Sequence, residues 1–171
     1  MKQIITVLSF LLAVFSTNAQ ADNHNHQQEG GFTVDTYKKF PPFPLLNLDS
    51  ARVNSSQAIE NKKKTVVVYF SPICNHCQHL AEDITGNMKS FKNVKFLFIS
   101  SYNITEIKTF ANNYGLNKFK NISLFQDDQY KFVNFYKLRS LPGIFVYDTN
   151  QDFLATMPDH FKIEDLIKAV N

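Results

Sequence analysis

The sequence predicts an α/β fold in which helices cover a central sheet, and three observations carry this prediction. The apolar runs 65–70 and 94–100 have the length and the β-branched or aromatic content of buried strands. Stretches such as 105–114, with apolar residues three or four positions apart, are typical of amphipathic helices. Because these two patterns alternate along the chain, we expect a single domain with a mixed β-sheet flanked by helices.

The first 21 residues have the pattern of a secretory signal peptide. A positive start at Met1-Lys2 precedes an apolar stretch from Ile4 to Phe15, and Ala19-Gln20-Ala21 fits a small-residue cleavage site. The apolar stretch is shorter than the roughly 20 residues that a membrane-spanning helix needs. We therefore expect a periplasmic or otherwise exported protein with a signal peptide at 1–21, and an uncleaved membrane anchor is the alternative.

The next segment, 22–40, is polar and lacks an apolar period, so we expect a flexible tail before a domain at 41–171. The net charge of +3 is modest and the basic residues are dispersed, so nucleic acid is not an expected partner. The one basic run, Lys62-Lys63-Lys64, precedes a predicted strand and is interpreted as a solvated turn.

The first half of the domain is expected to contain its central strand. Prolines at 41, 42 and 44 favour an extended segment that leads into a short strand at 45–48. One or two helical turns follow at 55–61. The run 65–70 is apolar on both faces, as in a strand that is covered on each side. A helix is then predicted over 74–91, with an apolar face formed by Leu80, Ile84 and Met88.

The second half continues the alternation. A second buried strand is predicted at 94–100 and a helix at 105–114, with Gly115 at the position that a helix C-cap favours. A short strand at 121–125 precedes a helical or irregular segment at 132–138. The predicted order ends with two strands at 144–147 and 153–157, antiparallel because a short turn joins them, and a closing helix at 163–170.

The two cysteines of the chain stand in the motif Cys74-Asn75-His76-Cys77, between the predicted central strand and the helix that follows it. Thiol–disulfide exchange needs one exposed thiolate that attacks and a second thiol that resolves the mixed disulfide. A cysteine at a helix N-terminus is stabilised as the thiolate, so we predict Cys74 as the nucleophile and Cys77 as the resolving thiol. His76 can donate to the Cys74 sulfur and tune the pair, which makes it a third predicted catalytic residue.

Four segments of the domain, one of which ends at Cys74, carry a resemblance to known proteins. They are 42–45, 66–74, 110–115 and 141–148. Together with the cysteines, they resemble the thioredoxin-like superfamily, and within it the exported TlpA-like and alkyl-hydroperoxide-reductase-like redoxins. The resemblance covers about residues 41–171 and implies a thioredoxin-like fold. It also implies a cis peptide bond before Pro142, opposite the cysteine motif, so Pro142 is the fourth predicted catalytic residue. The resemblance further implies a contact between Leu141 and the substrate backbone. Ile73 occupies the position where many members carry Trp, and is predicted to bind substrate with Leu141.

The chain departs from these families at two positions that matter for the resolving cysteine. Thioredoxin carries a buried Asp in the strand before its motif, where this chain has Val68. Reductive TlpA-like proteins place an acidic residue after the second core strand, where this chain reads Ser100-Ser101-Tyr102-Asn103. We therefore expect Cys77 to lack the usual base.

The leading hypothesis is an exported thiol–disulfide oxidoreductase that acts on protein cysteines or disulfides, needs no cofactor, and exchanges electrons with a membrane-bound redox partner. The direction of electron flow stays open, because His76 favours oxidation whereas the redoxin resemblance favours reduction. The alternative is a copper- or zinc-binding thioredoxin-like protein that uses Cys74, Cys77 and His76 or His79. A peroxidase is disfavoured because no Thr precedes Cys74 at the usual spacing.

Overall fold

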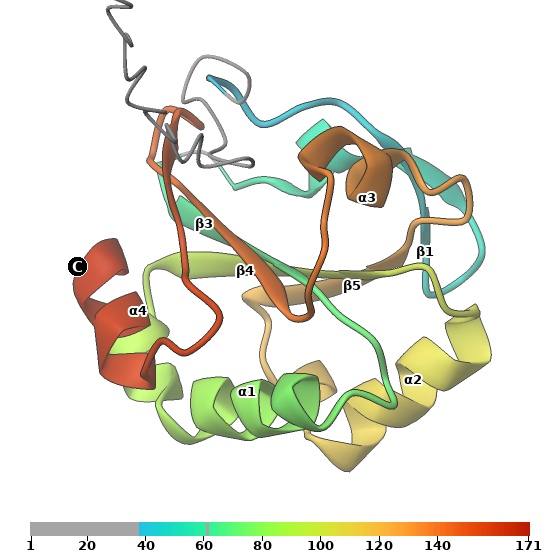
Figure 1. Ribbon diagram of the computed structural model, residues 1–171. Coiled ribbons are helices and arrows are strands. Elements are labelled where there is room, and N and C mark those ends of the chain that lie inside the picture. Colours follow the sequence, from blue (N-terminus) through green and yellow to red (C-terminus); the bar gives the residue numbers. More distant parts are fainter. Residues whose placement is uncertain (1–37, 61) are drawn as a thin grey trace, which may run out of the picture. The chain divides into compact units, whose positions relative to one another are not determined.

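A mixed β-sheet forms the centre of the computed structural model, which describes residues 38–60 and 62–171 (Figure 1). Within these residues the sheet has seven strands in the order β2-β1-β5-β4-β3-β6-β7. Strands β3, β4 and β5 are parallel, and the other pairs are antiparallel. The strands are β1 (Pro44–Asn47), β2 (Arg52–Asn54), β3 (Lys64–Tyr69), β4 (Val94–Ser100), β5 (Ile122–Gln126), β6 (Gly143–Tyr147) and β7 (Phe153–Thr156).

Helices cover both faces of this sheet (Figure 1). On one face lie α1 (Asn75–Gly86), α2 (Ile104–Asn113) and α4 (Ile163–Val170), and on the other lies the short helix α3 (Lys131–Tyr136). Three 3₁₀ segments complete the described elements: η2 (Ser55–Ala58), η3 (Met88–Phe91) and η4 (Leu116–Lys118). The α/β fold with one mixed sheet in a single domain is therefore confirmed.

The side chains of β3 explain why its sequence is apolar without interruption. Val66 and Val68 belong to the apolar cluster that contains the buried residues of α1, α2 and α4. Val67 and Tyr69 belong to the second cluster, which contains the buried residues of α3. Successive residues of a strand point to opposite faces, so a strand covered on both sides needs apolar residues throughout.

Two predicted elements differ from the structure. The single helix predicted over 74–91 is wrong, because α1 ends at Gly86 and η3 follows as a separate turn. The backbone N–H and the side-chain amide of Asn87 both donate to the Asp83 carbonyl, at 3.0 and 2.9 Å, and this caps the helix. Strand β2 was not predicted. It has three residues, two of them exposed, and so carries no apolar pattern.

The predicted signal peptide and most of the predicted tail lie outside the described residues. Residues 38–40, expected at the end of that tail, pack on the domain. The ring of Phe40 is buried 5.2 Å from that of Tyr147, and Lys39 Nζ lies 2.8 Å from an Asp152 carboxylate oxygen. In the part of the chain that the structure describes, no helix is both long and apolar enough to cross a bilayer.

Candidate active site

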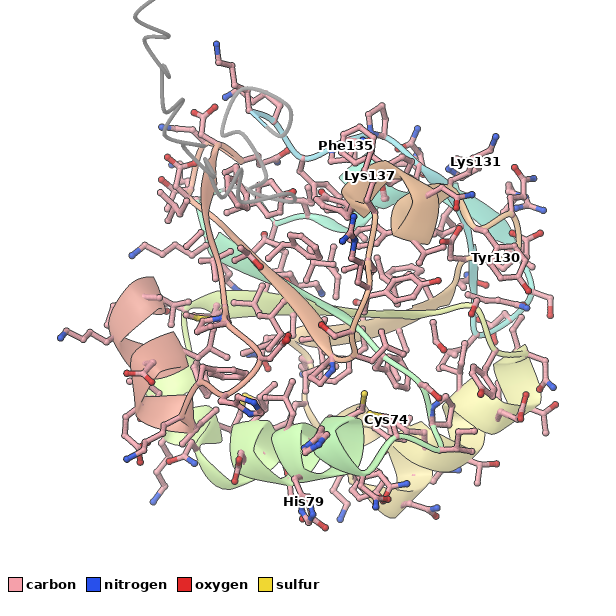
Figure 2. All side chains as sticks on the ribbon, in the orientation of Figure 1. Cys74, His79, Tyr130, Lys131, Phe135 and Lys137 are labelled. Atoms are coloured by element: carbon pink, nitrogen blue, oxygen red, sulfur yellow. The ribbon has the colours of Figure 1, made fainter. Side chains whose placement is uncertain are left out.

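Cys74 lies where the loop that follows β3 meets the start of α1. Cys74 is the N-cap residue of the helix, with an extended backbone (φ −86°, ψ 117°). Its N–H donates to the Ser71 carbonyl at 3.1 Å, and the Gln78 side-chain amide donates to the Pro72 carbonyl at 2.9 Å. These bonds hold the loop against the helix, and Figure 2 shows the Cys74 sulfur directed from the helix start toward the sheet.

The first turn of α1 is suited to a thiolate. It contains no acidic residue, and the Cys74 side chain makes no capping hydrogen bond to the helix N–H groups. The unpaired N–H groups of a first helical turn carry partial positive charge, which stabilises a nearby anion. The start of α1 therefore offers N–H groups to an anion and places no acidic side chain beside it.

The two thiols differ sharply in environment. Both cysteines are free thiols, with Cys74 half-buried and Cys77 only 1% exposed. Burial, together with the hydrogen bond and the negative charge of Cys74, raises the pKa of Cys77 to about 12. At neutral pH the inner sulfur is therefore held as the thiol, while the outer one is accessible to another molecule.

Leu141 lies beside the outer thiol, and its peptide bond to Pro142 is cis. The Cys74 thiol donates to the Leu141 carbonyl at 3.7 Å. Antiparallel pairing explains this neighbourhood, because Tyr69 at the end of β3 is opposite Gly143 at the start of β6. The loop before β6 must therefore meet the loop after β3.

The two histidines occupy exposed positions on α1. His76 and Pro142 line the same hollow, of about 140 Å³. Among the described residues, no hydrogen bond joins His76 to the Cys74 sulfur. His79 points away from the sheet, and its Nδ1 lies 3.4 Å from Glu82 Oε2 (Figure 2). His76 is thus positioned at the mouth of the site rather than against the attacking sulfur.

Ile73, immediately before the first cysteine, is 72% exposed. It lines a separate hollow of about 270 Å³ together with Pro72, Gln78, Phe110 and Tyr114. A large aliphatic side chain left in water beside a reactive thiol is available for contact with another molecule.

A metal site gains no support from the geometry. In the described part of the chain, no three side chains of His, Cys, Asp or Glu are grouped so that they could hold one metal ion. Zinc sites in proteins use at least three protein ligands. Cys74, Cys77, His76 and His79 therefore do not assemble the donor set that the metal-binding alternative requires.

The sequence analysis missed a buried carboxylate, Asp127. Its side chain accepts the N–H groups of Lys131 and Phe132 at 2.8 and 2.9 Å and the Tyr69 hydroxyl at 3.4 Å. Burial raises its pKa. Its partners Tyr69 and Phe132 belong to the α3 side of the core, whereas Cys77 belongs to the α1 side. Asp127 therefore caps α3 and does not serve Cys77.

The fold, together with a cysteine pair at the start of α1, defines a thioredoxin-like redoxin. A family model supports this, and the chain belongs to the AhpC/TSA family, whose model matches residues 36–153. A curated relative, protein disulfide isomerase-like 1-4 of Arabidopsis thaliana, is 24% identical over 146 residues. That match covers 76% of this chain but only 24% of the relative, so the chain spans about a quarter of that protein.

Solved structures agree on the fold. A secreted disulfide oxidoreductase of Mycobacterium tuberculosis, homologous to E. coli DsbE, is similar with a TM-score of 0.62 and 17% identity, over 75% of this chain and 94% of that one. The peroxidoxin BcpB of the same organism is similar with a TM-score of 0.63 and 16% identity, over 78% and 96% of the two chains. At these identities the likeness establishes the thioredoxin-like fold.

Proposed function

We propose that the protein is an exported thiol–disulfide oxidoreductase that exchanges disulfides with cysteines of other proteins. The observation that carries the proposal is the unequal pair on α1. The accessible Cys74 lies beside the Leu141 backbone, and the shielded Cys77 lies within the same helical turn. Export is inferred from the secretory pattern of residues 1–21, and a membrane-bound redox protein is the proposed electron partner.

In the reducing direction, the Cys74 thiolate attacks one sulfur of a substrate disulfide. The substrate S–S bond breaks, a mixed disulfide forms at Cys74, and the other substrate sulfur leaves as a thiolate that takes a proton from water. Leu141 lies next to the new bond, where its backbone is available to an extended substrate segment. Ile73 offers apolar contact on the same loop.

Cys77 completes the cycle. As a thiolate it attacks the Cys74 sulfur, which forms the Cys74–Cys77 disulfide and releases the second substrate thiolate. Two electrons have then passed from the pair to the substrate, and the reverse steps oxidise a substrate dithiol. The mixed disulfide removes the negative charge of Cys74, one of the causes that raise the Cys77 pKa. Cys77 therefore becomes more acidic at the stage when it must attack.

Trapping of the mixed disulfide tests this assignment. The Cys77→Ser variant, incubated with a protein that carries an accessible disulfide, should accumulate a covalent complex through Cys74. The matched Cys74→Ser variant should accumulate none, because its remaining thiol is buried. Equal trapping by both variants, or by neither, would reject the roles of the two cysteines.

The reduction potential of the pair, measured in glutathione buffers, then decides the direction. A value near or above about −150 mV would indicate an oxidant of exported proteins, and a value at or below about −230 mV a reductant fed by a membrane donor. Failure to form any intramolecular disulfide would overturn the proposal.

A further inference from the structure

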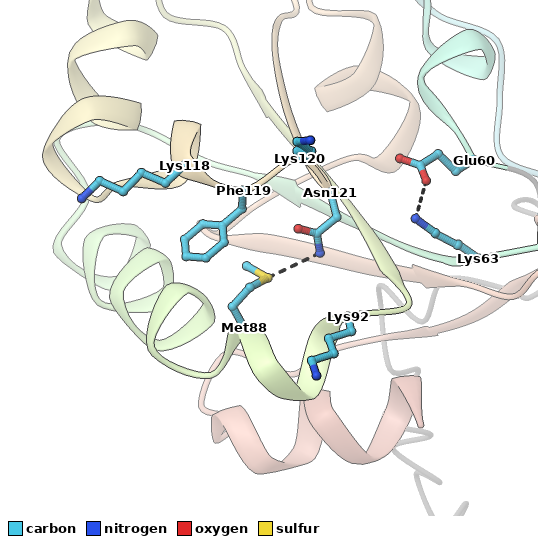
Figure 3. Close-up of a pocket in the computed structure, with 8 residues that line it drawn as sticks. All are labelled: Glu60, Lys63, Met88, Lys92, Lys118, Phe119, Lys120 and Asn121. Carbon is cyan, nitrogen blue, oxygen red and sulfur yellow. Dashed lines mark hydrogen bonds and ion pairs between the residues drawn. The ribbon is translucent and has the colours of Figure 1, made fainter.

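Three loops enclose a hollow of about 420 Å³ at the end of the sheet away from Cys74 (Figure 3). These loops precede β3, β4 and β5, which are parallel, so their amino ends lie at one edge of the sheet. Cys74 follows the carboxyl end of β3 and therefore lies at the opposite edge. The hollow is thus separate from the candidate active site. The residues that matter here are Glu60, Lys63, Lys92, Lys118, Phe119 and Lys120.

The lining of this hollow is strongly basic, with four lysines and one glutamate. The glutamate is ion-paired with two lysines. Its Oε2 atom lies 2.5 Å from Lys63 Nζ, and its Oε1 atom lies 3.3 Å from the ammonium group of the nearly buried Lys95. Figure 3 shows the Lys63 ammonium directed at Glu60. Lysines 92, 118 and 120 make no ion pair with any residue that the structure describes.

The floor of the hollow is apolar and firmly held. Met88 and Phe119 are half-buried there. The Asn121 side-chain amide donates to the carbonyl oxygens of Phe91 and Val94, at 3.1 and 2.8 Å, and contacts the Met88 sulfur (Figure 3). These bonds tie the loop before β5 to the loop before β4. Lysines 92, 118 and 120 therefore project from two loops that Asn121 joins by hydrogen bonds.

We propose that this hollow binds a multivalent small-molecule anion that carries at least two phosphate or carboxylate groups and an apolar portion. A lysine ammonium group binds an oxyanion as a point charge. Because lysines 92, 118 and 120 have no ion-pair partner among the described residues, a ligand with more than one negative group would suit them best. The volume falls within the range of small-molecule sites, and Met88 and Phe119 supply the apolar contact that such sites have. A concave site of this size favours a compact ligand over a flat macromolecular surface.

Calorimetric titration of the full chain with two probes, tripolyphosphate and citrate, tests the proposal. The site variant is Lys92→Gln/Lys118→Gln/Lys120→Gln. The matched control is Lys108→Gln/Lys131→Gln/Lys168→Gln, which removes three exposed lysines outside the hollow and has the same net charge. We expect the site variant to bind at least about tenfold more weakly than the wild type, and the control to bind within about twofold of it, because screening limits distant charges.

The two probes separate the possible sources of the negative groups. Binding of tripolyphosphate alone identifies phosphate, binding of citrate alone identifies carboxylate, and each result supports the site. Equal weakening by both variants would show attraction by overall charge and would overturn the proposal, as would failure of both probes to bind at low salt. Thermal unfolding of both variants shows that they are folded. The site variant is expected to lose the rise in Tm that the anion gives the wild type.

Discussion

The sulfur of Cys74 lies 3.7 Å from the carbonyl oxygen of Leu141, a residue 67 positions further along the chain. The antiparallel pairing of β3 with β6 brings together the loop that follows β3 and the loop that precedes β6, and these two loops carry Cys74 and Leu141. A substrate joined to Cys74 would therefore have its backbone beside that of Leu141, with Ile73 close by on the active-site loop. This arrangement predicts that Cys74 reacts with other molecules before Cys77 does, and that Ile73 contacts a bound protein substrate.

The two thiols should differ in reactivity toward iodoacetamide. At pH 8 the pKa of about 12 leaves Cys77 almost entirely as the unreactive thiol, and burial blocks the reagent as well. We expect peptide mass spectrometry of the folded, reduced protein to find the label on Cys74 alone. In guanidinium both cysteines should react at similar rates, which is the control. Comparable labelling of Cys77 in the folded protein would contradict the shielded role.

Ile73 should contribute to the recognition of protein substrates but not to folding. Its side chain is 72% exposed, so the free energy of unfolding of Ile73→Ser should stay within about 0.5 kcal/mol of the wild type. Loss of its apolar contact should lower kcat/KM for a protein disulfide about fivefold, whereas glutathione disulfide, which is too small to use that contact, should react unchanged.

Leu154→Ser is the matched control for Ile73→Ser, since Leu154 is another exposed aliphatic residue, on β7. It should leave kcat/KM for both substrates at the wild-type value. An equal loss with glutathione disulfide, or in the Leu154 variant, would show that Ile73 does not bind the protein chain.

The buried strands and the cysteine pair could be predicted from sequence because their signals are local. The uninterrupted apolar run of β3 and its junction with the Cys74 motif lie within a single segment of the chain. Phe40 could not be placed, because its burial depends on Tyr147 across the fold. The break at Asn87 was missed since the apolar spacing continues to Met88 and conceals the cap.

The basic hollow escaped the sequence analysis for a related reason. The visible basic run contains Lys63, whose charge Glu60 neutralises. The unpaired lysines at 92, 118 and 120 are scattered in the sequence, and only the parallel strands bring their loops to one edge. The lysine run in the sequence therefore does not mark the place where unpaired positive charge gathers in the fold.

Asp127 should stabilise the folded protein more at low pH than at neutral pH. Burial raises its pKa in the folded state, so its contribution to stability is full below the unfolded pKa and declines as pH rises through the folded value. Asp127→Asn replaces one of the two carboxyl oxygens that accept the Lys131 and Phe132 N–H groups with an amide NH₂ group that cannot accept, at a cost of about 1–3 kcal/mol. We expect urea unfolding to show the largest deficit near pH 4 and a smaller one near pH 7.

The neighbouring Asp128 offers a matched control of opposite sign. Its two carboxylate oxygens accept the Arg52 guanidinium at 2.7 and 2.9 Å, which lowers the pKa of Asp128. That contribution is present above the unfolded pKa and lost as pH falls. The deficit of Asp128→Asn should therefore grow with pH and remain small, because both side chains of the pair are partly exposed to solvent. Parallel pH trends in the two variants would contradict this account.

Glu60 should matter more to stability than either lysine that it contacts. Its carboxylate neutralises Lys95, whose side chain is only 7% exposed. Glu60→Gln leaves that ammonium buried without a counter-charge, and we expect a loss of about 2–3 kcal/mol in urea unfolding at pH 7. Lys63, followed by Lys95, lowers the pKa of Glu60, so the stabilisation is present above the unfolded value and is lost as pH falls. The gap between wild type and variant should narrow toward pH 4.

Removal of Lys95 should cost far less than removal of Glu60. Lys95→Met keeps an apolar stem of similar length, and Glu60 retains Lys63 at 2.5 Å, so the variant should unfold within about 1 kcal/mol of the wild type. The double variant Glu60→Gln/Lys95→Met should recover most of the stability that Glu60→Gln loses, because no buried charge is left unpaired. If the double variant stays as unstable as Glu60→Gln, the loss arises from the Lys63 contact or the loop itself, and the buried charge of Lys95 is not its cause.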